Sequence, residues 1–241
     1  MANYSIRPIP LCEGPRDASM YAYRLPPGTP TKAVCYSWYI EGSKPRIMVD
    51  TGLTTAMAPR SFPTALNTPE AALARLGLKP DDIEIVIVTH LHFDHIGLGH
   101  LYRKARFIVQ KKELDYARNP HPMEAHLYDR SMFEDLDFEV VNGRKRIIPG
   151  VSVLLTPGHS PGGQSVVINT SAGKAIITGF CCQLRTFEPT EAMKQQGWEA
   201  SAPMLHQDVR DVYDSVLKVK RRADIIIAQH DPSFVEKDRI P

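Results

Sequence analysis

Three histidines and an aspartate lie within six residues directly after an apolar run, and no other feature constrains the fold of this chain as strongly. The run, residues 83–89, is rich in isoleucine and valine and has the length of a buried strand. His90 and His92 follow it, and because a strand directs alternate side chains to one face, both can reach the same point. Asp94 and His95 lie where the chain turns into a helix and can reach a second point nearby. The pattern predicts a metal site just past the end of a strand.

Two further histidines also follow apolar runs. His159 comes shortly after residues 151–155, and His230 comes shortly after residues 225–228. Functional residues of layered α/β folds are commonly carried by loops at strand ends. Imidazole and carboxylate ligands suit zinc, and also manganese or iron, so the residue types alone do not select the metal.

The rest of the chain alternates strand-like blocks with helices. A helix is expected from Thr68 to Leu76, because a capping hydroxyl and a proline begin it and Gly77 ends it. A second helix is expected over 209–217, where apolar residues recur at helical spacing. Further strands and a short helix are expected at 4–11, 33–40, 46–49, 107–109, 165–168 and 175–177, and at 111–118.

Length and composition indicate one ordinary globular domain covering residues 1–241. The net charge is only +2 and no stripe of lysine or arginine occurs, so a nucleic-acid partner is not expected. No run of 18 apolar residues and no apolar leader segment are found, so no membrane association is expected. Four cysteines are too few for a disulfide framework in a chain of this length, which predicts a cytoplasmic protein.

The order of these motifs resembles that of the metallo-β-lactamase superfamily. The resemblance is carried by residues 50–52 (Asp-Thr-Gly), the motif at 90–95, residues 156–162 around His159, and His230. Within the superfamily the chain is most similar to the N-acyl-homoserine lactonase branch, through the aromatic segment 35–39, Thr89 before the histidine motif, residues 149–162, and Asp231 after His230.

The resemblance implies an αββα four-layer sandwich with the metal site at the edge between its two sheets. It implies two groups of ligands. His90, His92 and His159 would hold a first metal, and Asp94, His95 and His230 would hold a second. The expected cofactor is therefore zinc, as one or two ions, with manganese and iron as alternatives.

The resemblance also implies a role for two aspartates and a reaction. Asp94 would serve as the catalytic base that orients the attacking water, and Asp50 would brace metal-binding histidines. The implied protein is a metal-dependent hydrolase that opens a small-molecule lactone or similar ester through a metal-bound hydroxide. A thioesterase or another ester or amide hydrolase on the same fold is the alternative among enzymes.

Two positions depart from the family pattern. Phe180 stands where the family has an aspartate that bridges the two metals, and Gln183 stands where the lactonase branch has a tyrosine. Three hypotheses follow from these departures: the second metal is weak or absent, Cys182 replaces the missing ligand, or the protein binds a metal or ligand without catalysis. Cys181 is expected to be a buried apolar residue. Under the first hypothesis, Phe180→Asp should raise affinity for the second metal.

Four other histidines are assigned lesser roles. His121 and His126 belong to segment 119–137, which is expected to cross one end of the molecule, and His100 follows a glycine-rich turn. His121 and His126 are expected to be surface residues, and His100 is expected either to support the metal ligands or to lie at the surface. His206 is expected at the start of the last long helix, where capping the helix or contacting substrate would each explain it.

Overall fold

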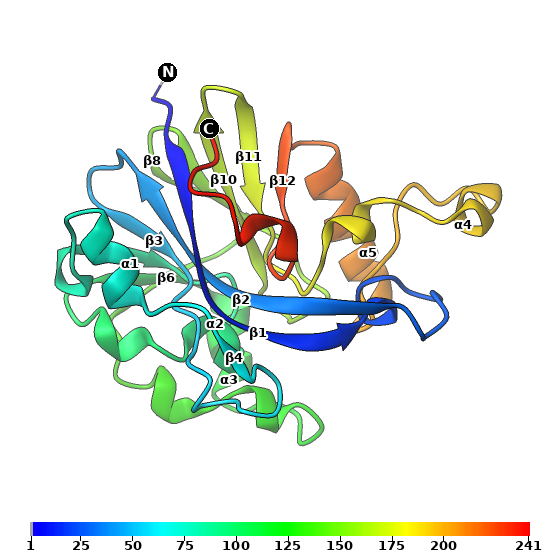
Figure 1. Cartoon of the computed structure of the whole chain (residues 1–241), viewed down its shortest axis with the longest axis horizontal. Helices are drawn as coiled ribbons and strands as arrows, with labels where there is room; N and C mark the ends of the chain where they lie inside the picture. Colours follow the sequence, from blue (N-terminus) through cyan, green and yellow to red (C-terminus); the bar gives the residue numbers. More distant parts are fainter. Residues whose placement is uncertain (1) are drawn as a thin grey trace.

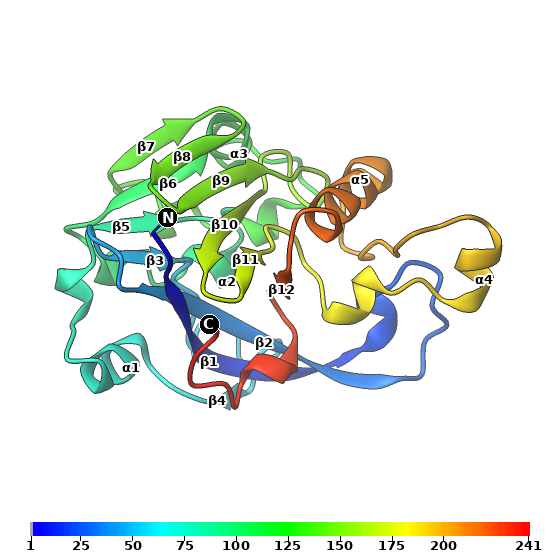
Figure 2. The same cartoon turned by 90° about the horizontal axis from the view of Figure 1, so that it is seen from above.

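The computed structural model describes residues 2–241 and contains two sheets that pack face to face (Figures 1 and 2). The larger sheet has the strand order β4-β1-β2-β3-β5-β6-β7 and the smaller sheet the order β12-β11-β10-β9-β8. The strands of the larger sheet are β1 (Ser5–Asp17), β2 (Pro30–Glu41), β3 (Ile47–Val49), β4 (Thr64–Ala65), β5 (Ile85–Ile87), β6 (Arg106–Gln110) and β7 (Phe138–Val141). Those of the smaller sheet are β8 (Lys145–Ile148), β9 (Val151–Leu155), β10 (Gln164–Thr170), β11 (Gly173–Ile177) and β12 (Ile225–Ile227).

Helices cover the outer face of each sheet. The helices are α1 (Pro69–Arg75), α2 (Phe93–Ile96), α3 (Lys111–Ala117), α4 (Glu191–Gln195) and α5 (Val209–Lys220). Residues of α1 and α3 pack with Val86 and Phe107 on one side of the molecule. On the other side α5 packs against Ile176 of β11. The layers are therefore helix, sheet, sheet, helix, and the predicted αββα sandwich is confirmed.

The core between the sheets combines the inner faces of both. Trp38, Ile87 and Ile108 from the larger sheet pack in one cluster with Val153 and Ile177 from the smaller sheet. Strands β3, β5, β6 and β7 are parallel neighbours. A parallel strand covered on both faces needs apolar residues throughout rather than in alternation. This explains the continuous apolar run before His90.

The first hairpin is longer than the sequence predicts. The sequence predicts β1 at 4–11 and β2 at 33–40, but their pairing continues to Asp17 and Pro30. A register shift between Pro10 and Cys12 interrupts the ladder. Proline has no backbone donor and bulges break the alternation of side chains, so the extension leaves little periodic signal. In both views the end of this hairpin lies beside the segment of α4, where the rings of Tyr23 and Trp198 stack at 6.3 Å.

Helix starts are predicted more accurately. Thr68 caps α1 through a 3.2 Å hydrogen bond from the backbone N–H of Ala71, with Pro69 as the first helical residue. Short 3-10 helices not expected from the sequence occur at Ala18–Tyr21, Pro80–Asp82, Gly99–Leu101, Ala125–Leu127, Arg130–Met132, Leu184–Phe187 and Pro232–Phe234. Across residues 2–241 there is no helix with the length and apolar character needed to span a bilayer.

Candidate metal centre

Six side chains from three separate segments meet at one edge of the sandwich and form two groups. The first group consists of His90, His92 and His159, and the second of Asp94, His95 and His230, with the ligand atoms of each group within 4.8 Å of one another. We refer to these groups as the first and second trio. Strand β5 leads to His90, β9 leads to the loop of His159, and β12 leads to His230. The structure brings together all six residues that the family resemblance implies as ligands.

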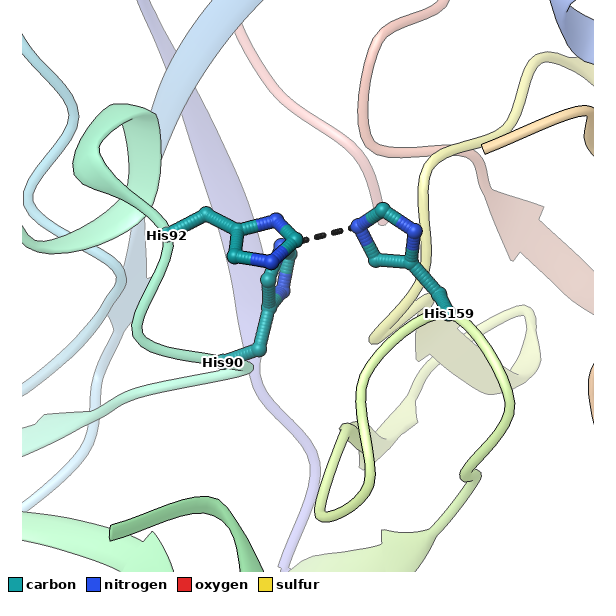
Figure 3. A group of neighbouring side chains, drawn as sticks. All are labelled: His90, His92 and His159. Carbon is teal, nitrogen blue, oxygen red and sulfur yellow. Dashed lines mark hydrogen bonds between the residues drawn. The ribbon is translucent and has the colours of Figure 1, made fainter. Parts of the chain in front are cut away.

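The imidazole rings of the first trio point toward a common centre (Figure 3). The Nε2 atoms of His90 and His159 lie 3.2 Å apart, and the ring centroids of His92 and His159 are separated by 4.8 Å. His159 Nδ1 lies 2.7 Å from the carbonyl oxygen of Leu205, to which it donates. In a neutral ring this leaves the lone pair on Nε2, directed at the centre of the trio.

Burial keeps the first trio neutral. It lowers the pKa of His90 and His92 well below 6.5, and the neighbouring histidines lower both further. Burial also lowers the pKa of His159 to about 4. Three uncharged imidazoles that converge in a buried site form a donor set suited to a divalent cation.

The second trio is built around the carboxylate of Asp94. Asp94 Oδ2 lies 3.7 Å from His95 Nε2 and 3.8 Å from His230 Nε2. His230 Nδ1 donates to the carbonyl oxygen of Val34 at 3.0 Å, so its Nε2 also points inward. Burial lowers the pKa of His230 to about 4, opposed by the charge of Asp94. Burial raises the pKa of Asp94, but the attraction of its carboxylate to His95, and to His230 when that ring is protonated, outweighs burial and lowers the pKa overall.

His95 provides the test of whether a metal fits. Its Nδ1 lies 2.8 Å from Asp50 Oδ2, whereas its Nε2 is buried and has no hydrogen-bond partner among the described residues. A buried polar atom left without a partner is costly, and native structures rarely contain one without a reason. A metal ion between His95, Asp94 and His230 would satisfy it. The residues present therefore fit a metal in both trios.

Asp50 braces this arrangement, which confirms the role that the family resemblance implies for it. One of its oxygens accepts from the backbone N–H of Thr89, and the other accepts from the Thr89 hydroxyl, both at 2.7 Å, and from Gln229 Nε2. Gln229 Oε1 in turn accepts from the indole N–H of Trp38 at 2.9 Å. Asp50 has a φ of 54°, a left-handed conformation that aspartate tolerates better than most residues. The role of Gln229 was not predicted.

Glu113 is a second residue that the sequence did not single out. It is fully buried on α3 and accepts from the backbone N–H of Leu91 at 2.9 Å and of Gly162 at 3.0 Å. Leu91 lies between His90 and His92, and Gly162 lies three residues after His159. One carboxylate therefore ties together the two loops that carry the first trio.

Both trios line a cavity of about 510 Å³. Apolar side chains form much of its wall, including Met20, Tyr21, Phe62, Leu127, Met204 and Leu205. Of the four lesser histidines, His126 and His206 line this cavity, and His100 and His121 do not. The predicted capping role of His206 is wrong, because Asp208 caps α5 by accepting from the backbone N–H groups of Arg210 and Asp211.

The residues that depart from the family pattern face away from this cavity. Phe180 is fully buried beside Phe187 and α5, and it does not line the cavity. The Cys182 thiol lies 3.1 Å from the Thr178 hydroxyl in the same apolar cluster, so the hypothesis that Cys182 replaces the bridging ligand is wrong. Cys181 lines the cavity but belongs to neither trio. Gln183 donates to the carbonyl oxygen of Lys32 at 2.7 Å and is also absent from the wall.

Comparisons with known proteins agree with this geometry. The family model described as "Metallo-beta-lactamase superfamily" matches residues 30–230. An N-acyl homoserine lactonase of Bacillus cereus is 29% identical over 177 residues, which cover 67% of this chain and 69% of that protein. The lactonase AttM of Agrobacterium fabrum is also 29% identical, over 170 residues that cover 65% of this chain and 61% of that protein.

Two solved structures resemble the whole fold. A quorum-quenching N-acyl homoserine lactone hydrolase superposes with a TM-score of 0.76 at 27% identity, covering 96% of this chain and 94% of that one. An N-acyl homoserine lactone hydrolase with the product N-hexanoyl-L-homoserine bound at its catalytic metal center gives a TM-score of 0.75 at 26% identity, covering 96% and 95%.

Proposed function

Because the chain belongs to the metallo-beta-lactamase superfamily, we propose that its residues 1–241 form one hydrolase domain that opens a lactone or a similar carboxylic ester. Similarity to the N-acyl homoserine lactonases supports a metal-dependent hydrolase. The observation that carries the proposal is the convergence of two ligand trios, with the orphaned Nε2 of His95, on one cavity large enough for a small molecule.

The first trio would hold one metal and the second trio another, with zinc as the proposed ion and manganese or iron as alternatives. A bound metal would supply a Lewis acid that polarises the ester carbonyl and lowers the pKa of a water it holds towards about 7. The two sites would differ in strength. The first trio has three neutral imidazoles, whereas the second has Asp94 as its one carboxylate and no bridging carboxylate from position 180.

The protein's own residues would orient the reactants and move the proton. Asp94 stays ionised near neutral pH because the neighbouring histidines lower its pKa against the effect of burial. Its Oδ2 can therefore accept the proton of the attacking water. The hydroxyl group of the water then bonds to the carbonyl carbon, the ester C–O bond breaks, and the proton goes to the alkoxide that leaves. Gln183 does not line the cavity, so it would take no part in protonating that alkoxide.

Three residues would keep the inner nitrogens in position. The carbonyl oxygens of Leu205 and Val34 hold the Nδ1–H groups of His159 and His230, and Asp50 holds His95. Such hydrogen bonds select the tautomer and orient the ring of a metal-binding histidine.

We also propose a cytoplasmic location, which is supported by the four cysteines, all of which are free.

The test combines metal content with turnover. The protein would be loaded with zinc, manganese or iron and assayed with N-hexanoyl homoserine lactone, γ-butyrolactone, a p-nitrophenyl ester and a thioester. His92→Ala should lose most of the metal by elemental analysis and nearly all activity, whereas His100→Ala, an exposed histidine outside the cavity, should keep both.

Three results would change the proposal. Full metal content in His92→Ala would contradict the assignment of the first trio. Tightly bound metal without hydrolysis of any of these compounds would favour a non-catalytic binding protein. Turnover of the thioester in clear preference to the lactones would favour the thioesterase alternative.

A further inference from the structure

The charged side chains that line the cavity are unequally engaged. Asp94 belongs to the second trio, and Glu124 accepts hydrogen bonds from the Tyr116 hydroxyl and from Gln207. Among the residues that the structure describes, Arg16 is the one lysine or arginine that lines the cavity. Arg16 therefore brings to this wall a guanidinium group, which has five N–H donors and no acceptor.

The guanidinium group of Arg16 is held in place by one of its three nitrogens. Nη1 donates to the carbonyl oxygens of Pro15 and Ser61, both at 2.8 Å. Cζ lies 4.9 Å from the centroid of the Phe62 ring, which also lines the cavity. The Nε–H and Nη2–H groups make no hydrogen bond to residues 2–241. They are the adjacent donors that match the two oxygens of a carboxylate.

The apolar surroundings of Arg16 favour a ligand that accepts hydrogen bonds from these free donors. The side chain is partly buried, and Met20, Tyr21 and Phe62 place apolar surface on the same wall. A neutral, apolar substrate would remove water from the guanidinium group without replacing its hydrogen bonds, which is unfavourable. A substrate with an anionic group would replace them with charge-assisted hydrogen bonds, which are roughly twice as strong as neutral ones.

We infer that the substrate of this cavity is a lactone or ester that carries a carboxylate, and that Arg16 binds this carboxylate while the scissile carbonyl lies at the histidine trios. The inference rests on the proposed function for the identity of the reaction, but the binding of the anion by Arg16 is separate from it. Arg16 is thus a specificity-determining residue rather than one that takes part in bond cleavage.

A purely structural role for Arg16 makes different predictions. If Arg16 only fastens the end of β1 to the Ser61 loop, its replacement should affect all substrates alike, through stability or the shape of the cavity. If it binds a carboxylate, replacement should change the ratio between a charged and a neutral substrate. The discriminating quantity is therefore the ratio of kcat/KM for two substrates that share the same ring and differ in one charge.

A suitable pair is 5-oxotetrahydrofuran-2-carboxylate and its neutral carboxamide. The metal-loaded wild type should prefer the carboxylate, and this preference should weaken as salt concentration rises. Arg16→Gln should reduce the preference about 10-fold or more, mainly through KM. Arg16→Lys, which keeps the charge but not the pair of adjacent donors, should give an intermediate value. Arg60→Gln, which removes a cation from the Ser61 loop but outside the cavity lining, is the matched control.

Binding of tetrahydrofuran-2-carboxylate, which has no scissile carbonyl, would be measured by calorimetry on the same metal-loaded proteins. If the wild type hydrolyses both lactones without preferring the carboxylate, or if Arg16→Gln keeps the wild-type preference, the inference is overturned and the proposed function stands. If neither lactone is hydrolysed but the analogue binds the wild type about 10-fold or more tightly than Arg16→Gln, the proposed hydrolysis fails and the binding of a carboxylate by Arg16 stands. If neither hydrolysis nor Arg16-dependent binding is found, both fail.

Discussion

Phe180→Asp would place a carboxyl group where the family carries its bridging aspartate. The sequence suggests that this change raises affinity for a second metal, but the structure indicates that it does not. Phe180 is fully buried and packs against Phe187, with ring centroids 6.3 Å apart, and against α5. An aspartate in this conformation would lie in an apolar cluster rather than between the two trios. We therefore expect a loss of stability and no gain of the second metal.

The turn itself keeps position 180 in this orientation. The backbone N–H of Gly179 donates to the Ser165 hydroxyl at 2.9 Å, and a Cβ atom at Gly179 would lie 2.0 Å from the carbonyl oxygen of Gln164. The N–H of Thr178 donates to the carbonyl oxygen of Ile227 at 3.0 Å. Rotating the turn to bring residue 180 into the cavity would break these contacts.

The size of the effect follows from burial. Removing a fully buried phenylalanine ring costs about 3–5 kcal/mol, and an unpaired polar group in its place adds about 1–3 kcal/mol. The free energy of unfolding should therefore fall by about 4 kcal/mol or more. For a chain of this length each kcal/mol shifts Tm by about 2–4 °C, so Tm should fall by roughly 8–16 °C.

The assay is calorimetric unfolding together with elemental analysis of metal per chain. Phe180→Asn is the matched control, because it has the same shape as the aspartate and lacks the charge. Both variants should lose similar stability and bind the same amount of metal. The reasoning is refuted if Phe180→Asp binds more metal than Phe180→Asn and is also the more stable of the two, because the carboxylate would then have reached the second trio.

Two further predictions concern groups that hold the site together. Glu113→Gln should lower the free energy of unfolding by about 1–3 kcal/mol, because an amide can accept from only one of the two buried N–H groups at once. It should also weaken metal binding to the first trio in a chelator competition, whereas Glu134→Gln on the surface should change neither. The metal-free protein should lose stability as the pH falls from 6.5 towards 4. The pKa of His159 and His230 is about 4 in the folded protein, so the unfolded chain binds more protons than the folded chain in this range. Each of the two histidines should lower the free energy of unfolding by about 3 kcal/mol. Urea unfolding at pH 7, 5 and 4 measures this loss, and equal stability at all three values would contradict it.

The ligands could be read from the sequence because their geometry is local. His90 and His92 follow a buried strand directly, and Asp94 and His95 lie on the helix turn after it, so the chain itself sets their spacing. His159 and His230 required only that β9 and β12 end at the same edge as β5. The layered fold provides this, since strands that lead to the same edge deliver their loops together.

Residues whose roles depend on distant segments could not be read in this way. Glu113 follows two lysines on a short helix and has the pattern of an exposed side chain, but it is buried because α3 contacts the glycine-rich loop after His159. A Cβ atom at Gly162 would lie 2.2 Å from the backbone nitrogen of Glu113. The direction of Phe180 and the cavity position of Arg16 likewise depend on contacts between segments far apart in the chain.

The second trio is preformed even though position 180 contributes no carboxylate. Asp50 holds His95 and is itself held by Thr89 and Gln229, and the carbonyl oxygen of Val34 holds His230. Ligands that are already oriented lose little conformational freedom when a metal binds. What the second site lacks is negative charge between two cations, which repel strongly at a separation of about 3.5–4 Å. The expected result is a specific site with reduced affinity, one that fills after the first trio as metal is added.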